Sequence, residues 1–205
     1  MRTRHLVHAF AVLLVTSAAA PSSATDPSGA PSAFVAELAR KAFLSVDGGT
    51  PSSVDRRQLL QGLLDEDFDV PRIAGFVLGR HWQKASDAER QTFIAVFRDF
   101  MVRAYSHRFT EYSGRSLRVI GEQAQSATAT VVYTEISQPS SGQPTKVEWR
   151  VIDRDGYRII DISIAGVSMA LAEREEFASS LQRNGGDLSN LIERLQLKMS
   201  EQQSR

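Results

Sequence analysis

The sequence of 205 residues contains no cysteine. Disulfide bonds, thiolate metal sites and thiol nucleophiles are therefore excluded, and so is a lipid anchor attached to a cysteine after a leader. A chain without disulfides must obtain its stability from a hydrophobic core. The length is sufficient for one domain with such a core.

The sequence also has few histidines and no net charge. Of the four histidines, His81 and His107 are the two beyond the N-terminal segment, and they show no metal-ligand spacing. The acidic cluster from Asp65 to Asp69 lacks the glycine turn of a calcium loop, so we interpret it as a solvated helix end. The 24 basic residues equal the 24 acidic residues. We therefore expect no metal, no cofactor and no binding of nucleic acid.

Long apolar runs are absent beyond the N-terminus, and no stretch there approaches the roughly 20 residues of a membrane-spanning helix. The short apolar run Phe10–Val15 follows Arg2 and Arg4 and precedes small residues, an order typical of a secretory signal peptide. We predict cleavage after Ala24 rather than after Ala20, where a proline would follow.

Cleavage at that point divides the chain into four parts. Removing 24 of the 205 residues leaves 181, and removing the two leader arginines leaves 22 basic against 24 acidic residues. The predicted parts are a signal peptide at 1–24, a flexible leader at 25–32, a single domain at 33–198 and a polar tail at 199–205.

Hydrophobic periodicity predicts helices on both sides of a central sheet. Steps of three and four indicate helices over 33–46, 54–64 and 68–78, and again after Ala170 on both sides of a Gly-Gly break. The strongest signal is the capping box Ser86-Asp87-Ala88-Glu89, which opens a helix running to about Tyr112.

Between Leu117 and Ile164 the hydrophobic period changes to two. Short turns such as Asp155-Gly156 join the predicted strands, which must therefore be antiparallel. The order of helices, meander and helices predicts an α+β domain, in which an antiparallel twisted sheet of four strands or slightly more packs against several helices.

The segment Gly166–Ala170 is similar to a nucleophile elbow, with alanine in place of the last glycine. An elbow needs a parallel strand and a histidine later in the chain. The predicted sheet is antiparallel and no histidine follows Ser168. We therefore interpret Ser168 as a helix N-cap, and the residues by themselves assemble no catalytic site.

Three segments resemble a known family in their order and spacing. They are Ile73–Trp82, which runs into the capped helix, Asp161–Met169, and Gly185–Ile192. The chain resembles the MlaC family, also called the toluene-tolerance or Ttg2 family, over roughly residues 33 to 198. It departs from the family at Ala165, where an acidic residue is frequent.

The resemblance implies a non-enzymatic periplasmic carrier that moves phospholipid between the outer membrane and an inner-membrane ABC transporter. It implies an apolar cavity for acyl chains between sheet and helices, and an outer-membrane lipoprotein complex as a further partner. A related branch is associated with hopanoid biosynthesis, so the resemblance leaves the identity of the lipid open. Two other classes remain as alternatives. One is a small cavity enzyme, a hydrolase or isomerase with Asp161 as the first acidic residue to test, and the other is an adaptor with a filled core.

We expect acyl chains to contact one face of the sheet and one face of the capped helix. Alternation nominates side chains from two sequential strands, which are expected to share a face, and the short helix before the capped one is expected to close the cavity. The predicted lipid-binding residues are Phe76, Val77, Phe97, Phe100, Met101, Tyr105, Val131, Tyr133, Val147, Trp149 and Val151. Periodicity alone does not distinguish a cavity wall from a filled core.

The N-terminal pattern generates a prediction about the compartment. Fractionation of Gram-negative cells that express the full chain is expected to find a shortened, soluble protein in the periplasm, with Thr25 as its first residue. A variant without residues 1–24 is the control and is expected to stay in the cytoplasm. Full-length protein retained in the cytoplasm would contradict the interpretation.

Overall fold

The computed structural model describes residues 30–47, 52–106, 115–137 and 143–203. The predicted signal peptide and His107 lie outside these ranges. In chain order the elements are α1 (Ala30–Asp47), α2 (Ser53–Asp67), α3 (Val70–Leu78), α4 (Arg80–Lys84), α5 (Asp87–Ser106), β1 (Ser116–Ser126), β2 (Ala129–Ser137), β3 (Thr145–Asp153), β4 (Tyr157–Ile164), β5 (Val167–Ser168), α6 (Met169–Arg183) and α7 (Leu188–Gln203).

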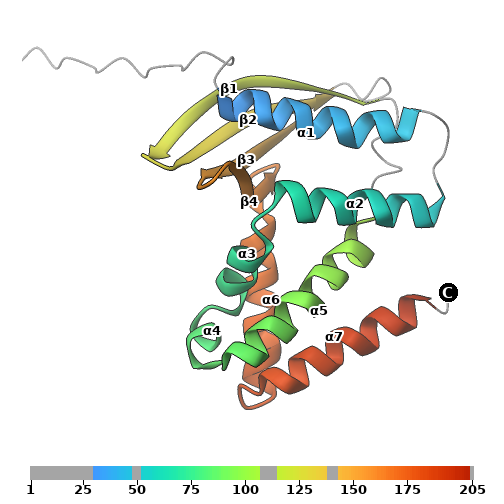
Figure 1. The fold of residues 1–205 in the computed structure, drawn as a ribbon, viewed down its shortest axis with the longest axis vertical. Helices are drawn as coiled ribbons and strands as arrows, with labels where there is room; N and C mark the ends of the chain where they lie inside the picture. The colour runs from blue at the N-terminus through green and yellow to red at the C-terminus, as the bar shows by residue number, and fades with distance from the viewer. Residues whose placement is uncertain (1–29, 48–51, 107–114, 138–142, 204–205) are drawn as a thin grey trace, which may run out of the picture.

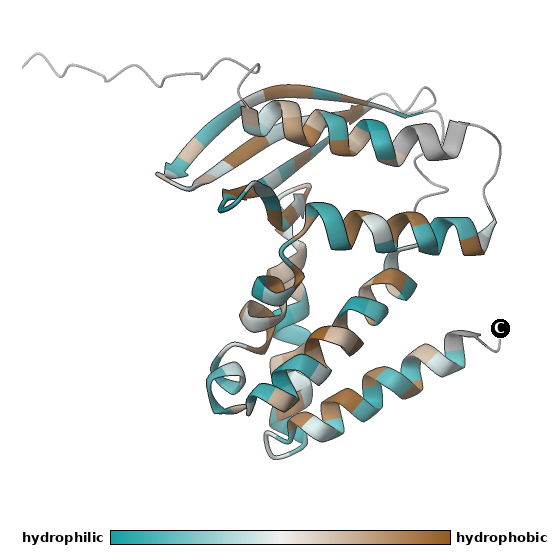
Figure 2. Cartoon of the chain, in the orientation of Figure 1, coloured by the Kyte–Doolittle hydropathy of each residue, from teal (hydrophilic) through white to brown (hydrophobic). Residues whose placement is uncertain are grey.

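The five strands form one sheet in the order β1-β2-β3-β4-β5, and every neighbouring pair is antiparallel. This meander confirms the predicted α+β class, with the two-residue β5 as an additional strand. In Figure 1 the sheet and α1 lie at one end of the molecule, α3, α5, α6 and α7 lie at the other end, and α2 lies between them. Figure 2 shows apolar residues recurring between polar ones along α2, α5 and α7, as expected for helices with one buried side.

The apolar side chains form two separate cores. The helical core is centred on Phe177 of α6, whose ring lies 6.0 Å from that of Phe93 and 6.1 Å from those of Phe97 and Phe100, measured between ring centroids. The sheet core lies between α1 and the inner face of the strands. Phe68, between α2 and α3, packs against both cores.

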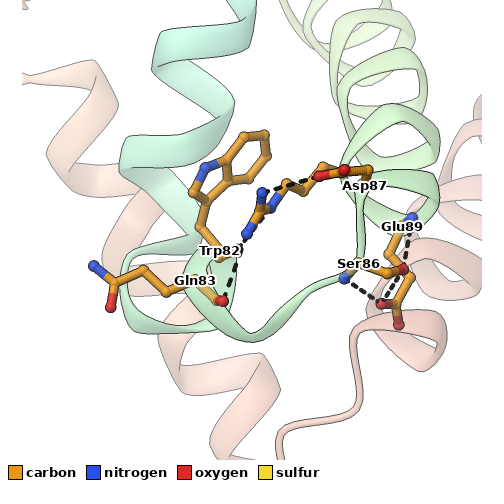
Figure 3. A network of polar contacts seen from close by, with 6 residues as sticks. Trp82, Gln83, Ser86, Asp87 and Glu89 are labelled. Carbon is orange, nitrogen blue, oxygen red and sulfur yellow. Dashed lines mark hydrogen bonds and ion pairs between the residues drawn. The ribbon is translucent and has the colours of Figure 1, made fainter.

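The predicted capping box is present at the start of α5. The Ser86 amide donates to Glu89 Oε2 at 2.8 Å, and the Glu89 amide donates back to Ser86 Oγ at 3.3 Å (Figure 3). Two otherwise free amides of the helix terminus are thereby paired. The capping box therefore sets where α5 begins, at the corner between α4 and α5.

Trp82, at the end of the first resemblance segment, stabilises this corner. The Arg90 guanidinium lies 5.4 Å from the Trp82 ring centroid, and its Nε donates to the Trp82 carbonyl at 2.9 Å. A Cβ built on Gly75 would lie 3.2 Å from a carbon of the same ring. Glycine at this position therefore permits α3 to approach the indole closely.

The helices extend further than predicted at both ends of the domain. Helix α1 begins at Ala30, inside the stretch expected to be a leader, and Ser32 is buried there. The Ser32 amide and hydroxyl donate to Glu122 Oε2 at 3.0 and 2.6 Å, so a carboxylate of β1 satisfies the start of the helix. Helix α7 continues to Gln203, with Met199 buried.

The face assigned to β2 was wrong. Val132 lies opposite Trp149, whereas Val131 lies opposite Arg150. Successive side chains of a strand point to opposite faces, so Val131 and Tyr133 lie on the other side of the sheet from the nominated residues of β3. Adjacent valines on β2 made the alternation ambiguous from sequence.

A buried polar residue defines the correct face. Thr134 is 1% exposed and lies opposite Val147. Its hydroxyl donates to the Val147 carbonyl at 3.1 Å and accepts from Trp149 Nε1–H at 2.9 Å. Because both hydrogen bonds of this hydroxyl are made inside the sheet core, a polar residue is stable on the buried face. The alternation argument took polar residues to face solvent, and it therefore placed Thr134 on the wrong side of the sheet.

The aromatic core generates a stability prediction. Phe177→Ala is expected to lower the free energy of unfolding by about 3–5 kcal/mol, because three neighbouring rings lose their partner. Phe76→Ala is the matched control: its ring is 43% exposed and the change is expected to cost at most about 1 kcal/mol. Urea unfolding checks both values, and equal losses would contradict the assignment of the core.

Candidate functional site

A cavity of about 220 Å³ lies between the sheet and the helices. Its lining is apolar apart from Tyr105, Asp161, Glu173 and the indole nitrogen of Trp149. The lining residues are Leu38, Ala39, Ala42, Leu60, Leu63, Leu64, Phe68, Val70, Ile73, Phe97, Met101, Tyr105, Leu117, Ile136, Val147, Trp149, Ile160, Asp161, Ile162, Ile164, Met169, Ala170 and Glu173.

The cavity exists at the boundary between the two cores. Helices α1, α2 and α3 contribute small and aliphatic side chains to its wall. Further lining residues come from α5 and α6 and from the strands β1 to β4. A bulge in β4 at Ile160 keeps Ile159 and Ile162 both on the inner face, opposite Val151 and Trp149. The Asp69 amide, which donates to the Ile159 carbonyl at 3.0 Å, ties the α2–α3 junction to this strand.

Five of the eleven predicted residues line this cavity. They are Phe97, Met101, Tyr105, Val147 and Trp149. The structure therefore brings the α5 stripe and the inner face of β3 together at one cavity. Met101 is only partly buried within the protein, so its flexible thioether is available to the cavity.

The other six predicted residues lie outside the cavity lining. Val77, Phe100 and Val151 are 1%, 4% and 1% exposed and belong to the filled cores. Phe76 faces away from the core, and the guanidinium of Arg174 lies 4.8 Å from its ring centroid. The remaining two are the β2 residues on the opposite face of the sheet.

Sequence reasoning missed the contributions of α1, α2, α6, β1 and β4, and on α3 and β2 it named residues outside the lining. Leucines of α2 and residues such as Leu38 of α1 carry a visible helical stripe. That stripe indicates a buried face, but it does not reveal which helix covers the sheet and which packs on other helices. The isoleucines of β4 were recognised as a strand, and only the register shows that Ile162 and Ile164 face Trp149 and Val147.

Asp161 and Ser168 form a turn-stabilising pair at one edge of the cavity. Asp161 accepts hydrogen bonds from Ser168 Oγ–H at 2.6 Å and from the Ala170 amide at 3.0 Å. Ser168 Oγ in turn accepts from the Leu171 amide at 3.0 Å and caps α6. The predicted N-cap is thus confirmed, and β5 pairs antiparallel with β4, unlike the parallel strand of a nucleophile elbow.

Glu173 is the second carboxyl group of the cavity lining. It is 9% exposed, and Tyr105 donates its phenolic hydrogen to Glu173 Oε1 at 2.9 Å. Within the described residues, Glu173 Oε2 is buried without a hydrogen-bond partner. Burial raises the pKa of Glu173, the bond from Tyr105 opposes that rise, and the neighbouring Glu176 adds to it while Lys198 opposes it.

Other candidate chemistry is absent from the described part of the chain. No group of three or more histidine, aspartate or glutamate side chains there is arranged to hold a metal ion. His81 lies on α4 beside Gly186 of the α6–α7 turn. No helix in the described ranges has the length and apolarity needed to cross a membrane.

Ala165, the departure from the resembled family, lies in the turn between β4 and β5. Its φ is +50° and it is exposed. The left-handed region is unfavourable for alanine by roughly 1–2 kcal/mol and is better tolerated by aspartate or asparagine. Ala165 is outside the cavity lining, so the departure concerns a turn and not the cavity.

Comparison with known proteins agrees with this architecture. Residues 41–197 match the family model described as MlaC protein. The chain is also similar to the solved phospholipid-binding protein from Ralstonia solanacearum, whose structure holds a phospholipid. The two share 20% sequence identity with a TM-score of 0.70, and the match covers 83% of this chain and 97% of the other. At that identity the structural likeness establishes a shared fold.

The raised pKa of Glu173 generates a pH prediction. The pKa of this carboxyl is higher in the folded state than its ordinary value of 4.5, so its contribution to stability is fully present below pH 4.5. That contribution is lost as the pH rises through the folded-state pKa. Relative to Glu173→Gln, the wild type is therefore expected to lose stability as the pH rises above 4.5. Urea unfolding over a pH series checks this, with the exposed residue Glu175 changed as Glu175→Gln for control. A pH-independent difference between wild type and Glu173→Gln would refute it.

Proposed function

This chain belongs to the MlaC family, and on that premise we propose that it is a periplasmic carrier that binds phospholipid acyl chains in the cavity between its sheet and its helices. The observation that carries the proposal is the cavity itself, which is bounded by aliphatic and aromatic side chains from both cores. The phospholipid held by the Ralstonia solanacearum protein of the same fold supports the choice of ligand.

The physical properties of the cavity suit transport. Each methylene removed from water contributes about 0.8 kcal/mol, so a long acyl chain contributes on the order of 10 kcal/mol. An apolar wall matches the chemistry of a membrane interior without directional bonds that would fix one chain length. Binding is then comparable to residence in a bilayer, which allows both uptake and release.

The proposed partners follow from the family. We propose that lipid is exchanged between an outer-membrane lipoprotein complex and an inner-membrane ABC transporter, with this chain moving through the periplasm between them. The N-terminal pattern of Arg2, Arg4 and an apolar run supports that compartment. A hopanoid or another lipid of similar apolar bulk is the alternative cargo.

We propose a binding role rather than a hydrolase or isomerase reaction. Asp161 and Ser168, the residues that an enzyme interpretation would use, are hydrogen-bonded to each other and to amides at the start of α6. Their geometry accounts for a turn and a helix cap. The cavity volume argues against the adaptor interpretation, which requires a filled core.

Native mass spectrometry of the purified chain tests the proposal and identifies the lipid. The wild type is expected to carry phospholipid, whereas Val147→Trp is expected to carry much less while remaining folded, because the larger ring occupies the cavity. Val151→Trp is the matched control on the same strand. It lies in the filled core, so overpacking there is expected to cost about 1–3 kcal/mol of stability.

Two outcomes would contradict this assignment. A wild-type chain that carries no lipid and takes none from vesicles of phosphatidylethanolamine and phosphatidylglycerol would contradict the carrier function. A Val147→Trp variant that loses stability but retains lipid at the wild-type level would place Val147 in the core and not in the cavity wall.

A further inference from the structure

The two carboxyl groups of the cavity lining differ in how their oxygens are satisfied. Both oxygens of Asp161 accept hydrogen bonds, from Ser168 and from the Ala170 amide. Among the residues that the structure describes, Glu173 has a partner on Oε1 alone, and its Oε2 is buried without one. Buried polar atoms are nearly always paired in folded proteins, because an unpaired one forfeits its bonds to water. The missing partner of Glu173 therefore requires an explanation.

The surroundings of Glu173 determine which kind of partner fits. Tyr105 of α5 donates to Oε1, so that oxygen acts as an acceptor and the remaining capacity lies on Oε2. The other charged or titratable groups facing this region are Asp161 of β4, Glu176 of α6 and Lys198 of α7. Lys198 lies 3.7 Å from Glu176, and Asp161 is engaged in the turn.

We propose that Glu173, oriented by Tyr105, donates a hydrogen bond from Oε2 to the acyl carbonyl oxygen of a lipid bound in the cavity. This inference deepens the proposed function and rests on it. The required chemistry is a carbonyl oxygen at the head of an acyl chain, which an ester-linked phospholipid and a free fatty acid both provide. A phosphate-bearing or carboxylate-bearing lipid is better matched by a neutral donor than by a charged carboxylate.

The protonation state of Glu173 agrees with a donor role. Burial raises the pKa of this carboxyl, which favours the neutral form that carries a hydrogen on one oxygen. With Oε1 accepting from Tyr105, the hydrogen resides on Oε2. The single directional bond would fix how deep the acyl chain sits, while the apolar wall accommodates its length.

A pair of matched lipids tests the hydrogen bond without any mutation. Dipalmitoyl phosphatidylglycerol carries ester carbonyls, and its dihexadecyl ether analogue has chains of the same length without them. In competition for the purified chain, the wild type is expected to prefer the ester by about 5–10-fold, the ratio that one ordinary hydrogen bond provides. As the pH rises through the raised pKa of Glu173, the preference is expected to fall.

Variants then assign the preference to Glu173. Glu173→Leu is expected to bind both lipids equally, whereas Glu173→Gln keeps a donor and is expected to retain the preference at every pH. Glu175→Leu, two residues further along the same helix and exposed, is the control and is expected to behave as the wild type. Tyr105→Phe is a second variant, expected to reduce the preference while leaving the carboxyl group in place.

The outcomes separate this inference from the proposed function. A phospholipid preference abolished by Glu173→Leu supports the ester as the acceptor, and weaker palmitate binding by the same variant, without an ester preference, supports the free acid. If the wild type binds ester and ether equally and Glu173→Leu leaves palmitate binding unchanged, the hydrogen bond is overturned and the carrier function stands. If no lipid binds at all, the carrier function is overturned together with it.

Discussion

The aromatic contact between α5 and α6 is the interaction on which the rest of the structure depends. Phe177 lies against Phe93 and Phe97, and each of these three rings is at most 2% exposed. The helices therefore hold one another through their own core, while α1 and part of α2 cover the sheet. Side chains can fill each of the two cores and still leave space between them. The cavity lies at that boundary and follows from this division.

Polar groups inside this structure act at a few defined places. Thr134 and Trp149 satisfy each other within the sheet core, and Asp161 and Ser168 secure the turn into α6. Each such pair fixes a direction that apolar packing alone would leave free. Glu173, a residue of the cavity lining, differs because its Oε2 is buried and has no hydrogen-bond partner among the described residues. Among the cavity-lining residues, Glu173 is therefore the one whose side chain can gain a hydrogen bond from a ligand.

The resemblance segments acquire distinct physical roles in the structure. The first contains Gly75 and Trp82, whose close approach shapes the corner between α3 and α5. The second contains Asp161 and Ser168, which set the start of α6. Both therefore position the two helices that carry Phe97, Tyr105 and Glu173, and neither segment supplies the bulk of the cavity wall. The segments that carry the family resemblance therefore position the helices around the cavity more than they form its surface.

The sequence by itself determined the elements and their order, because capping, periodicity and turn chemistry are local. The Ser86–Glu89 capping box, the Ser168 cap and the antiparallel meander were all predictable, as was the apolar stripe of α5 that contains Phe97, Met101 and Tyr105. Only the tertiary structure decided which apolar faces meet each other and which meet a void. Val131 and Val132 are adjacent and both buried, and the β2–β3 register alone separates them. Val147 and Val151 share a face and both belong to the sheet core, yet Val147 lines the cavity and Val151 does not. That distinction depends on how closely helices from distant parts of the chain approach the sheet, a quantity that no local pattern of residues encodes.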